Sequence, residues 1–401
     1  MQFGEIIPRR AYIFRSLKHP DEAKIFREVY GAGFYLIAAY APHSARRDHL
    51  ARGIAKSRNE YPIDRHYERA EQLIARDEQE FGLRHGQNVS DTFHRADVFF
   101  DTSDREELQR SIRRFVELTF GNTFHTPTKK EFAMFLATAA ALRSAEMGRQ
   151  VGAAISTDAG DIIAVGTNEV PKAGGGLYWS DDKPDRREFV EGFDSNDQHK
   201  RNLVADTLRS LQTAGWLNME RSTQPIQQLV EESMKPDVLG SDAQFRGLIE
   251  FGRAVHAEMA ALVDAARRGV GISGASLFIT TFPCHLCARH IVAAGIDRVF
   301  FIEPYAKSLT AELYPDSIAV ESPQAGVKQV VFEPFVGVAP RQYMSLFTAL
   351  DRKRSDGTVI QFVPAGAIPR FSGNPKMYLE QEDEKVTVLG TLMTKQGNLF
   401  Q

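Results

Sequence analysis

The chain has 401 residues, of which 43% are hydrophobic and 25% are charged, so it is long enough for two or three globular domains with substantial cores. It has no run of about 18 apolar residues and no signal-peptide pattern at its start, which predicts a cytoplasmic protein without a membrane span. The net charge of −3 divides into +3 over residues 1–130 (22 Lys+Arg against 19 Asp+Glu) and −6 over the remainder (27 against 33), unlike the strongly basic surface of a dedicated nucleic-acid-binding protein.

The first part of the sequence has the pattern of an α/β domain. Residues 11–16 and 34–41 are predicted strands on either side of an amphipathic helix, and a third strand is predicted at 96–103. A strand, a helix and a second strand in this order are typical of parallel pairing. The next helix is predicted to begin with a capping box formed by Ser103 and Glu106.

A domain boundary is predicted where Gly, Asn, Thr and Pro cluster at residues 121–128. We therefore expect two domains, 1–125 and 126–401. The second domain begins with a helix for which Thr128 and Glu131 form a capping box. The predicted apolar stripe of this helix consists of Phe132, Phe135, Leu136, Ala139 and Leu142.

The second domain is predicted to alternate strands and helices around one insertion. Strands at 150–157 and 161–168 are joined by a short turn and form a hairpin. Residues 171–250 show no strand pattern and indicate an insertion that contains two helices. The elements predicted after the insertion are helix 256–268, strand 276–281, helix 284–294, strand 298–302 and strand 328–333.

The two cysteines of the chain, Cys284 and Cys287, fall within one four-residue window behind Pro283. Two thiols cannot form a disulfide framework, and a close pair in a reducing compartment is more often a metal or redox site. Upstream, His256 and Glu258 complete an H-x-E...P-C-x-x-C arrangement. Zinc binds imidazole nitrogen and thiolate sulfur, and a catalytic zinc keeps three protein ligands and an open fourth position. We predict that His256, Cys284 and Cys287 hold Zn²⁺.

The spacing of these residues suits the starts of two helices. Pro283 favours a first helical turn, where the i, i+3 spacing puts both cysteines on one face and the helix dipole stabilises their thiolates. His256 and Glu258 lie about 200° apart around a helix, so they converge only if His256 precedes the regular helix.

Glu258 supplies the proton transfer that a zinc-activated water needs for hydrolysis. The combined signature is that of zinc deaminases that act on cytosine or adenine. Taken alone, a C-x-x-C pair also suits a redox site and a single His suits a polar surface. His285 and His290 are expected to lie outside the ligand set.

The stretch HAEMAALVDAARRGVGISGASLFITTFPCHLCARHIVAAGIDRVFF resembles the deoxycytidylate (dCMP) deaminase branch of the cytidine deaminase superfamily, and the resemblance extends over residues 148–305. It implies a three-layer α/β/α fold with a five-stranded mixed sheet, in which two helix N-termini supply the zinc ligands. Transfer-RNA adenosine deaminases usually have Glu before the Pro and Met between the cysteines, so FPCHLC favours cytosine over adenine.

Several residues are candidate substrate contacts. The hairpin and its G-x-N-x-x-P turn resemble the same branch, which implies that Asn168 contacts the deoxyribose. Lys172 and Lys307 are placed along the chain where cations for a substrate phosphate are needed, and Ala257 and Tyr305 complete the candidate set. The alternatives are a turn Asn, two surface lysines and a core tyrosine.

The N-terminal stretch RRAYIFRSLKHPDEAKIFREVYGAGFYLIAAYAP resembles the later part of a P-loop nucleotide-kinase-like domain, as fused to a deaminase in bacterial antiphage deoxycytidine nucleotide deaminases. This resemblance implies conversion of dCTP and dCMP to deoxyuridine nucleotides in antiphage defence by nucleotide depletion. The chain has no G-x-x-x-x-G-K-[ST] loop, so we expect its N-terminal domain to regulate, scaffold or sense a partner and not to phosphorylate.

We therefore predict a zinc-dependent hydrolase that removes the 4-amino group of free dCMP or dCTP and that forms a homo-oligomer. A regulatory nucleotide, or an RNA or protein inhibitor, is a further expected partner. Residues of the insertion can stack on a base and hold a phosphate, although an oligomer contact is the alternative. These residues are Tyr178, Trp179, Arg186 and Arg187.

Two other functions remain open. A nucleic-acid cytosine or adenine deaminase needs a basic channel for single strands, and the acidic balance of residues 131–401 opposes this. A non-enzymatic binding module with a structural zinc needs a fourth protein ligand, and the presence of Glu258 beside the metal motif opposes that.

Overall fold

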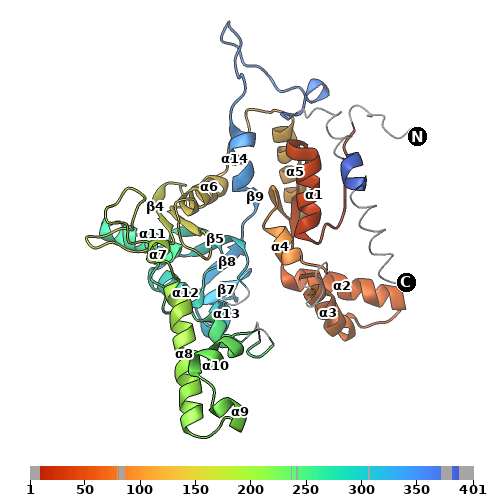
Figure 1. The fold of residues 1–401 in the computed structure, drawn as a ribbon. Helices are drawn as coiled ribbons and strands as arrows, with labels where there is room; N and C mark the ends of the chain where they lie inside the picture. Colours follow the sequence, from red (N-terminus) through yellow and green to blue (C-terminus); the bar gives the residue numbers. More distant parts are fainter. Residues whose placement is uncertain are drawn as a thin grey trace. The chain divides into compact units, whose positions relative to one another are not determined.

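The computed structural model describes residues 10–78, 80, 86–235, 237–240, 243–305, 308–371 and 382–387. The described residues divide into two compact units, one formed by Met1–Phe135 with Phe335–Gln401 and the other by Leu136–Pro334 (Figure 1). The segment after Pro334 thus groups with the N-terminal part of the chain, whereas the sequence analysis assigned 126–401 to a single domain. Within the described ranges, no helix has both the length and the apolar content needed to cross a bilayer.

The first unit contains a sheet with the strand order β1-β2-β9. The strands predicted at 34–41 and 96–103 are present as β1 (Ile37–Tyr40) and β2 (Val98–Asp101), which pair in parallel, and β2 pairs antiparallel with β9 (Gly337–Val338). The strand predicted at 11–16 is wrong, because these residues are exposed and lie outside any strand. An apolar run needs a paired neighbour to become a strand, and β1 is an edge of the described sheet.

Two helices of this unit, α5 (Arg105–Thr119) and α14 (Pro340–Phe347), supply part of its core. The unit also contains the helices α1 (Pro20–Tyr30), α2 (His43–Arg58), α3 (Tyr67–Glu78) and α4 (Val89–Phe93), with 3-10 turns η1 (Gly31–Gly33), η2 (Ile63–His66) and η4 (Pro364–Gly366). The buried cluster consists of Val98, Phe100, Phe115, Leu118, Val338 and Leu346.

Two helix starts test the predicted capping boxes. Helix α5 is capped by Asp104, whose carboxylate accepts from the Glu106 and Glu107 amides at 2.8 and 3.1 Å. The capping role predicted for Ser103 is therefore wrong by one residue. Helix α6 (Lys129–Ala141) begins as predicted, because the Thr128 amide donates to the Glu131 carboxylate at 2.7 Å and Thr128 Oγ1 accepts from the Glu131 amide at 3.2 Å.

The apolar stripe predicted for α6 is wrong. Phe132 and Leu142 are 40% and 73% exposed, while Ala137 and Ala141 are buried. The backbone of β3 (Gly152–Ser156) approaches α6 so closely that a Cβ added at Gly152 would lie 1.9 Å from the carbonyl oxygen of Ala137. Because β3 approaches so closely, the face of α6 that packs against it carries small side chains.

The second unit contains a six-stranded sheet in the order β4-β3-β5-β6-β8-β7. The strands other than β3 are β4 (Ile162–Thr167), β5 (Ser276–Thr281), β6 (Arg298–Glu303), β7 (Ile318–Val320) and β8 (Val330–Pro334). Strand β3 pairs antiparallel with β4 and β5, and the other pairs are parallel. The sheet is mixed, as expected, but the expected count of five is wrong because β7 adds a three-residue edge strand.

Helices cover both faces of this sheet. Gly166 pairs with Ala153, which is the neighbour of Gly152, so Gly152 and Gly166 point to opposite faces. Gly152 meets α6, whereas a Cβ added at Gly166 would lie 2.1 Å from the carbonyl oxygen of Ala257 in α11 (Ala257–Arg267). The α/β class and its helix layers on two faces agree with the prediction.

The remaining helices of the second unit lie in the insertion or beside the parallel strands. They are α7 (Glu188–Glu191), α8 (Ser195–Thr213), α9 (Met219–Ser222), α10 (Ile226–Ser233), η3 (Gln244–Gly247), α12 (His285–Ala293) and α13 (Thr310–Leu313). Helix α12 connects the parallel strands β5 and β6. As predicted, the described residues of the insertion contain no named strand, but they form the four α-helices α7, α8, α9 and α10 where two were predicted.

Candidate metal centre

His256 and Glu258 lie at the start of helix α11. His256 is the N-cap residue and has an extended backbone, with φ −68° and ψ 154°, while regular helix begins at Ala257. This geometry turns the imidazole away from the direction that a helical residue would give it, so the two side chains converge. His256 therefore precedes the regular helix, as predicted from its spacing to Glu258.

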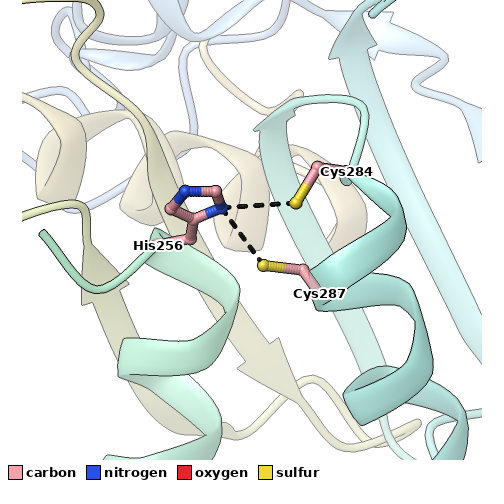
Figure 2. A group of neighbouring side chains, drawn as sticks. All are labelled: His256, Cys284 and Cys287. Atoms are coloured by element: carbon pink, nitrogen blue, oxygen red, sulfur yellow. Dashed lines mark hydrogen bonds between the residues drawn. The ribbon is translucent and has the colours of Figure 1, made fainter. Parts of the chain in front are cut away.

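Cys284 and Cys287 occupy the start of helix α12. Cys284 is the N-cap residue and Cys287 lies in the first turn, while Pro283 precedes the cap and is not itself in the first turn. Each sulfur lies 3.4 Å from Nδ1 of His256 (Figure 2). Helix α12 connects β5 to its parallel neighbour β6 and contacts α11, so both thiols lie next to the start of α11.

The donor set fits a zinc ion. The ligand atoms of His256, Cys284 and Cys287 all lie within 4.8 Å of one another, and His285 and His290 are not part of this group. A tetrahedral zinc with bonds of about 2.3 Å to sulfur and about 2.0 Å to nitrogen places these two donors about 3.5 Å apart. The observed separation of 3.4 Å between sulfur and nitrogen is close to that value.

The electrostatics of the group favour a bound cation. The hydrogen bond from Cys287 lowers the pKa of Cys284 to about 4, and the same hydrogen bond raises the pKa of Cys287. The hydrogen bond with Cys284 raises the pKa of His256 to about 9. The lowered pKa of Cys284 favours its thiolate, which is the deprotonated form that a metal ligand requires.

Glu258 is suited to moving a proton beside this group. Its side chain is 3% exposed, and burial raises its pKa to about 7. A carboxylate with a pKa near the working pH can both accept and return a proton. Glu258 also lies within hydrogen-bonding reach of Cys287, which places its carboxyl group next to the metal donors.

The candidate substrate contacts have other partners in this structure. Both ends of the buried Asn168 amide bind backbone, since Oδ1 accepts from the Val151 amide at 2.7 Å and Nδ2 donates to the carbonyl of Arg149 at 2.6 Å. Ala257 is fully buried against β4. Lys172 pairs with Asp182 of the insertion at 2.6 Å.

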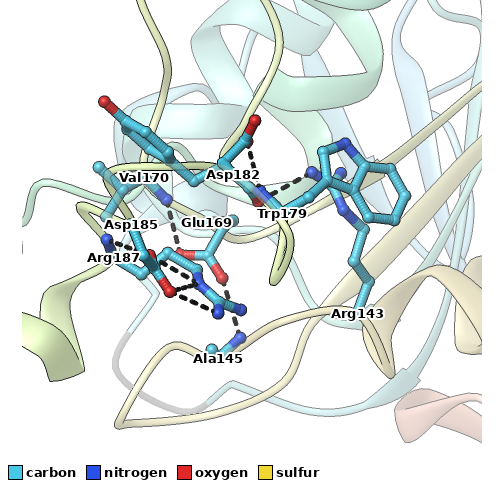
Figure 3. A network of polar contacts seen from close by, with 9 residues as sticks. Arg143, Ala145, Glu169, Val170, Trp179, Asp182, Asp185 and Arg187 are labelled. Carbon is cyan, nitrogen blue, oxygen red and sulfur yellow. Dashed lines mark hydrogen bonds and ion pairs between the residues drawn. The ribbon is translucent and has the colours of Figure 1, made fainter.

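Tyr305 and the aromatic and basic residues of the insertion are also placed. Burial raises the pKa of Tyr305, and the charge of Cys284 raises it further. Lys307 lies outside the described residues. Arg187 forms a bidentate pair with Asp185, and Trp179 stacks on the guanidinium of Arg143 at 3.5 Å (Figure 3).

Three charged residues of this unit, Glu169, Arg149 and Glu303, were not among the candidates predicted from the sequence. Glu169 is buried beside Asn168, and Arg149 pairs with Glu303 at the end of β6 at 2.5 Å. Glu169 has one sequence signal, an acidic residue that follows directly after a buried strand and its turn Asn. The pairing of Arg149 with Glu303 has no local signal, because 154 residues separate the partners.

Residues 127–303 match the family model described as the cytidine and deoxycytidylate deaminase zinc-binding region. The comparisons support the cytidine deaminase superfamily. The matched segment includes the metal donors His256, Cys284 and Cys287 and the nearby Glu258.

Two curated relatives show the extent of the similarity. ComE operon protein 2 of Bacillus subtilis (strain 168) is 29% identical over 104 residues, which is 26% of this chain and 53% of the relative. The deoxycytidylate deaminase of Enterobacteria phage T2 is 41% identical over 54 residues, which is 14% of this chain and 29% of the relative. The chain therefore spans about half of the first relative and less than a third of the second.

A solved structure of the dCMP deaminase from the cyanophage S-TIM5, in complex with dCMP and dUMP, is 20% identical to this chain. The alignment covers 53% of this chain and 100% of that one, with a TM-score of 0.29.

Proposed function

We propose that this chain is a zinc-dependent hydrolase that converts a free deoxycytidine nucleotide, dCMP or dCTP, to the deoxyuridine nucleotide with release of ammonia. The observation that carries the proposal is the group of His256, Cys284 and Cys287 at two helix starts, with the buried carboxyl group of Glu258 beside it. The zinc-binding family model and the name of the phage T2 relative support the substrate class.

The chemistry assigns separate tasks to these residues. His256, Cys284 and Cys287 hold the zinc, which when bound supplies a Lewis acid that lowers the pKa of a water molecule. Glu258 would accept a proton from the attacking water and deliver it to the 4-amino nitrogen as the C4–O bond forms and the C4–N bond breaks, so that water is consumed and ammonia leaves. Burial of Glu258 excludes bulk water from its carboxyl group and keeps its pKa near 7.

The positions near the metal group suggest how substrate binds. We propose that Tyr305, whose pKa is raised by burial and by the charge of Cys284, contacts the substrate. We propose that Asn168 contacts the deoxyribose after one of its two backbone hydrogen bonds is exchanged, and that Lys172 and Lys307 serve the phosphate. We propose that Ala257, the first residue of α11, contributes a further substrate contact.

The proposal extends to the rest of the chain. We propose that the N-terminal part is a P-loop-kinase-like α/β domain that regulates or scaffolds, and the parallel pairing of β1 with β2 supports this. Depletion of deoxycytidine nucleotides in antiphage defence, and assembly into a homo-oligomer, rest on the resemblance of the sequence to such deaminases.

The test is an ammonia-release assay of the purified protein with dCMP, dCTP and a cytosine-containing oligonucleotide. We expect release from at least one free nucleotide and none from the oligonucleotide. Glu258→Gln is expected to retain stoichiometric zinc and to lose at least about 100-fold in kcat, the scale of general acid–base catalysis. Release from the oligonucleotide alone, or a parent rate in Glu258→Gln, would contradict the proposal.

A further inference from the structure

Glu169 carries a buried carboxylate that is not part of the metal group. Its residue is 1% exposed, and its two oxygens accept from the backbone amides of Ala145 at 3.0 Å and Val170 at 2.9 Å (Figure 3). A carboxylate without such partners is costly to bury. These contacts therefore give the Glu169 side chain one defined position between β4 and the loop that contains Ala145.

The backbone of Glu169 is joined to the residue before His256. The Glu169 amide donates to the Val255 carbonyl at 3.2 Å, and the Val255 amide donates to the Glu169 carbonyl at 3.0 Å, which forms an isolated antiparallel bridge. Val255 is covalently attached to His256, the N-cap residue of α11. The position of the proposed metal ligand is thus tied to the backbone of Glu169.

The side chain of Glu169 ties a second segment to the same place. Ala145 begins a loop in which the Glu146 carboxylate accepts from the amides of Gly148 and Arg149 at 2.6 and 3.0 Å. Glu169 is the residue that contacts both the loop and the chain leading into His256.

Two guanidinium groups lie near the Glu169 carboxylate. The hydrogen bond to Asp185 raises the pKa of Arg187, and the charge of Glu169 raises it further. Burial lowers the pKa of Arg143, and the charge of Glu169 opposes this effect. Arg143 is itself held by the insertion, since it donates to the carbonyl of Tyr178 at 3.1 Å. Arg187 thus belongs to the insertion, and Arg143 is hydrogen-bonded to it. Both positive charges near Glu169 therefore depend on the insertion.

We propose that Glu169 is a positioning residue that fixes His256 relative to the 145–149 loop, and that Arg187 of the insertion balances its charge. The inference rests on the proposed function only in that His256 is a zinc ligand. Residues that hydrogen-bond a metal ligand change metal affinity about 10- to 100-fold when they are replaced, and Glu169 is linked to His256 through the backbone of Val255.

The test compares Glu169→Gln with Glu188→Gln. Glu188 is a matched control, because it is also a buried glutamate whose carboxylate accepts from a backbone amide, that of Ser195 at 2.8 Å, and it lies in the insertion. Each variant of the full chain is measured for zinc affinity by competition with a chelator, for the absorption spectrum of the cobalt-substituted protein, for the urea unfolding midpoint, and for turnover of dCMP and dCTP.

We expect Glu169→Gln to weaken zinc binding at least about 10-fold and to shift the cobalt spectrum, while Glu188→Gln lowers the unfolding midpoint but leaves both metal readouts at parent values. Parent zinc affinity and spectrum in Glu169→Gln overturn the proposal, and so does an equal loss of zinc affinity in both variants. If Glu169→Gln fails to fold, Arg187→Gln keeps the carboxylate and must weaken zinc binding in the same direction. A parent protein that binds zinc but deaminates neither nucleotide would refute the proposed function and leave the metal comparison valid.

Discussion

Gly166 of strand β4 lies against Ala257 of helix α11 so closely that an added Cβ would be 2.1 Å from the Ala257 carbonyl oxygen and 2.5 Å from the Ala261 amide nitrogen. Both near atoms belong to backbone, so neither can move without moving the helix. Because His256 is the N-cap residue of that helix, the contact between strand and helix determines where the imidazole lies.

Gly166→Ala is therefore expected to displace the start of α11 and to weaken zinc binding. Forcing extra volume into a packed contact costs about 1–3 kcal/mol of unfolding free energy. Urea unfolding and zinc stoichiometry by elemental analysis measure the two effects.

Gly53→Ala is the control, because Gly53 lies inside helix α2 with nothing within 4 Å of an added Cβ, and alanine is expected to stabilise that helix by about 0.5–1 kcal/mol. Parent zinc content in Gly166→Ala would show that the site tolerates a displaced helix.

Cys287→Ser is expected to purify with less than stoichiometric zinc, since it replaces one of three grouped donors by a weaker ligand. A metal that binds only the folded state stabilises it, so a chelator should lower the thermal midpoint of the parent protein and have little effect on the variant. Elemental analysis and thermal unfolding with and without chelator measure both. An unchanged zinc content in Cys287→Ser would remove this cysteine from the ligand set.

Much of the metal site could be predicted because its geometry is local. The i, i+3 spacing of Cys284 and Cys287 and the extended backbone of His256 depend on where two helices begin, and helix starts have sequence signals. The partners of the candidate substrate-binding side chains could not be predicted in the same way. The Asn168 side chain hydrogen-bonds the backbone of Arg149 and Val151, and Lys172 forms an ion pair with Asp182. These contacts depend on how segments that are separated in the sequence pack together.

The errors in the fold have physical causes of the same kind. Residues 11–16 have a strand pattern but no paired neighbour, and β7 pairs at a sheet edge although Ile318–Val320 is too short to show an alternating pattern. In α6 the large side chains suggested one buried face, whereas the close approach of Gly152 selects the alanine face. The local sequence pattern indicated the type of most elements, whereas the tertiary contacts determined which side chains are buried.

The stability of the first unit is expected to depend on pH through Glu117. A hydrogen bond from His125, 2.6 Å from Glu117 Oε2, lowers the pKa of Glu117 below its ordinary value of 4.5. A carboxylate with a lowered pKa stabilises the fold fully above pH 4.5, and this contribution is lost as the pH falls through the lowered pKa. Glu117→Gln should therefore reduce the unfolding free energy by about 1 kcal/mol at pH 7, with no difference at low pH. Urea unfolding at several pH values measures this, and curves that stay equally far apart at every pH would contradict it.

The ion pair of Arg114 with Glu131 is expected to contribute far more than the exposed pairs of the same helix. Both Nη atoms of Arg114 donate to the fully buried Glu131 carboxylate at 2.8 Å, and the Val338 amide donates to it at 2.8 Å. Removal of one partner of a buried pair leaves the other charge uncompensated, which costs about 3–5 kcal/mol. Arg114→Met is thus expected to lower the urea midpoint strongly.

Arg110→Met is the matched control, because Arg110 lies one turn earlier in α5 and its pairs with glutamates are exposed. Exposed pairs contribute about 0–1 kcal/mol, so this variant should unfold close to the parent midpoint. The double variant Arg114→Met with Glu131→Gln removes both charges, and it should be more stable than Arg114→Met alone, because the larger part of the loss comes from the unpaired buried carboxylate. If the double variant is the less stable of the two, the hydrogen bonds from Thr128 and Val338 to Glu131 stabilise the unit more than the ion pair does.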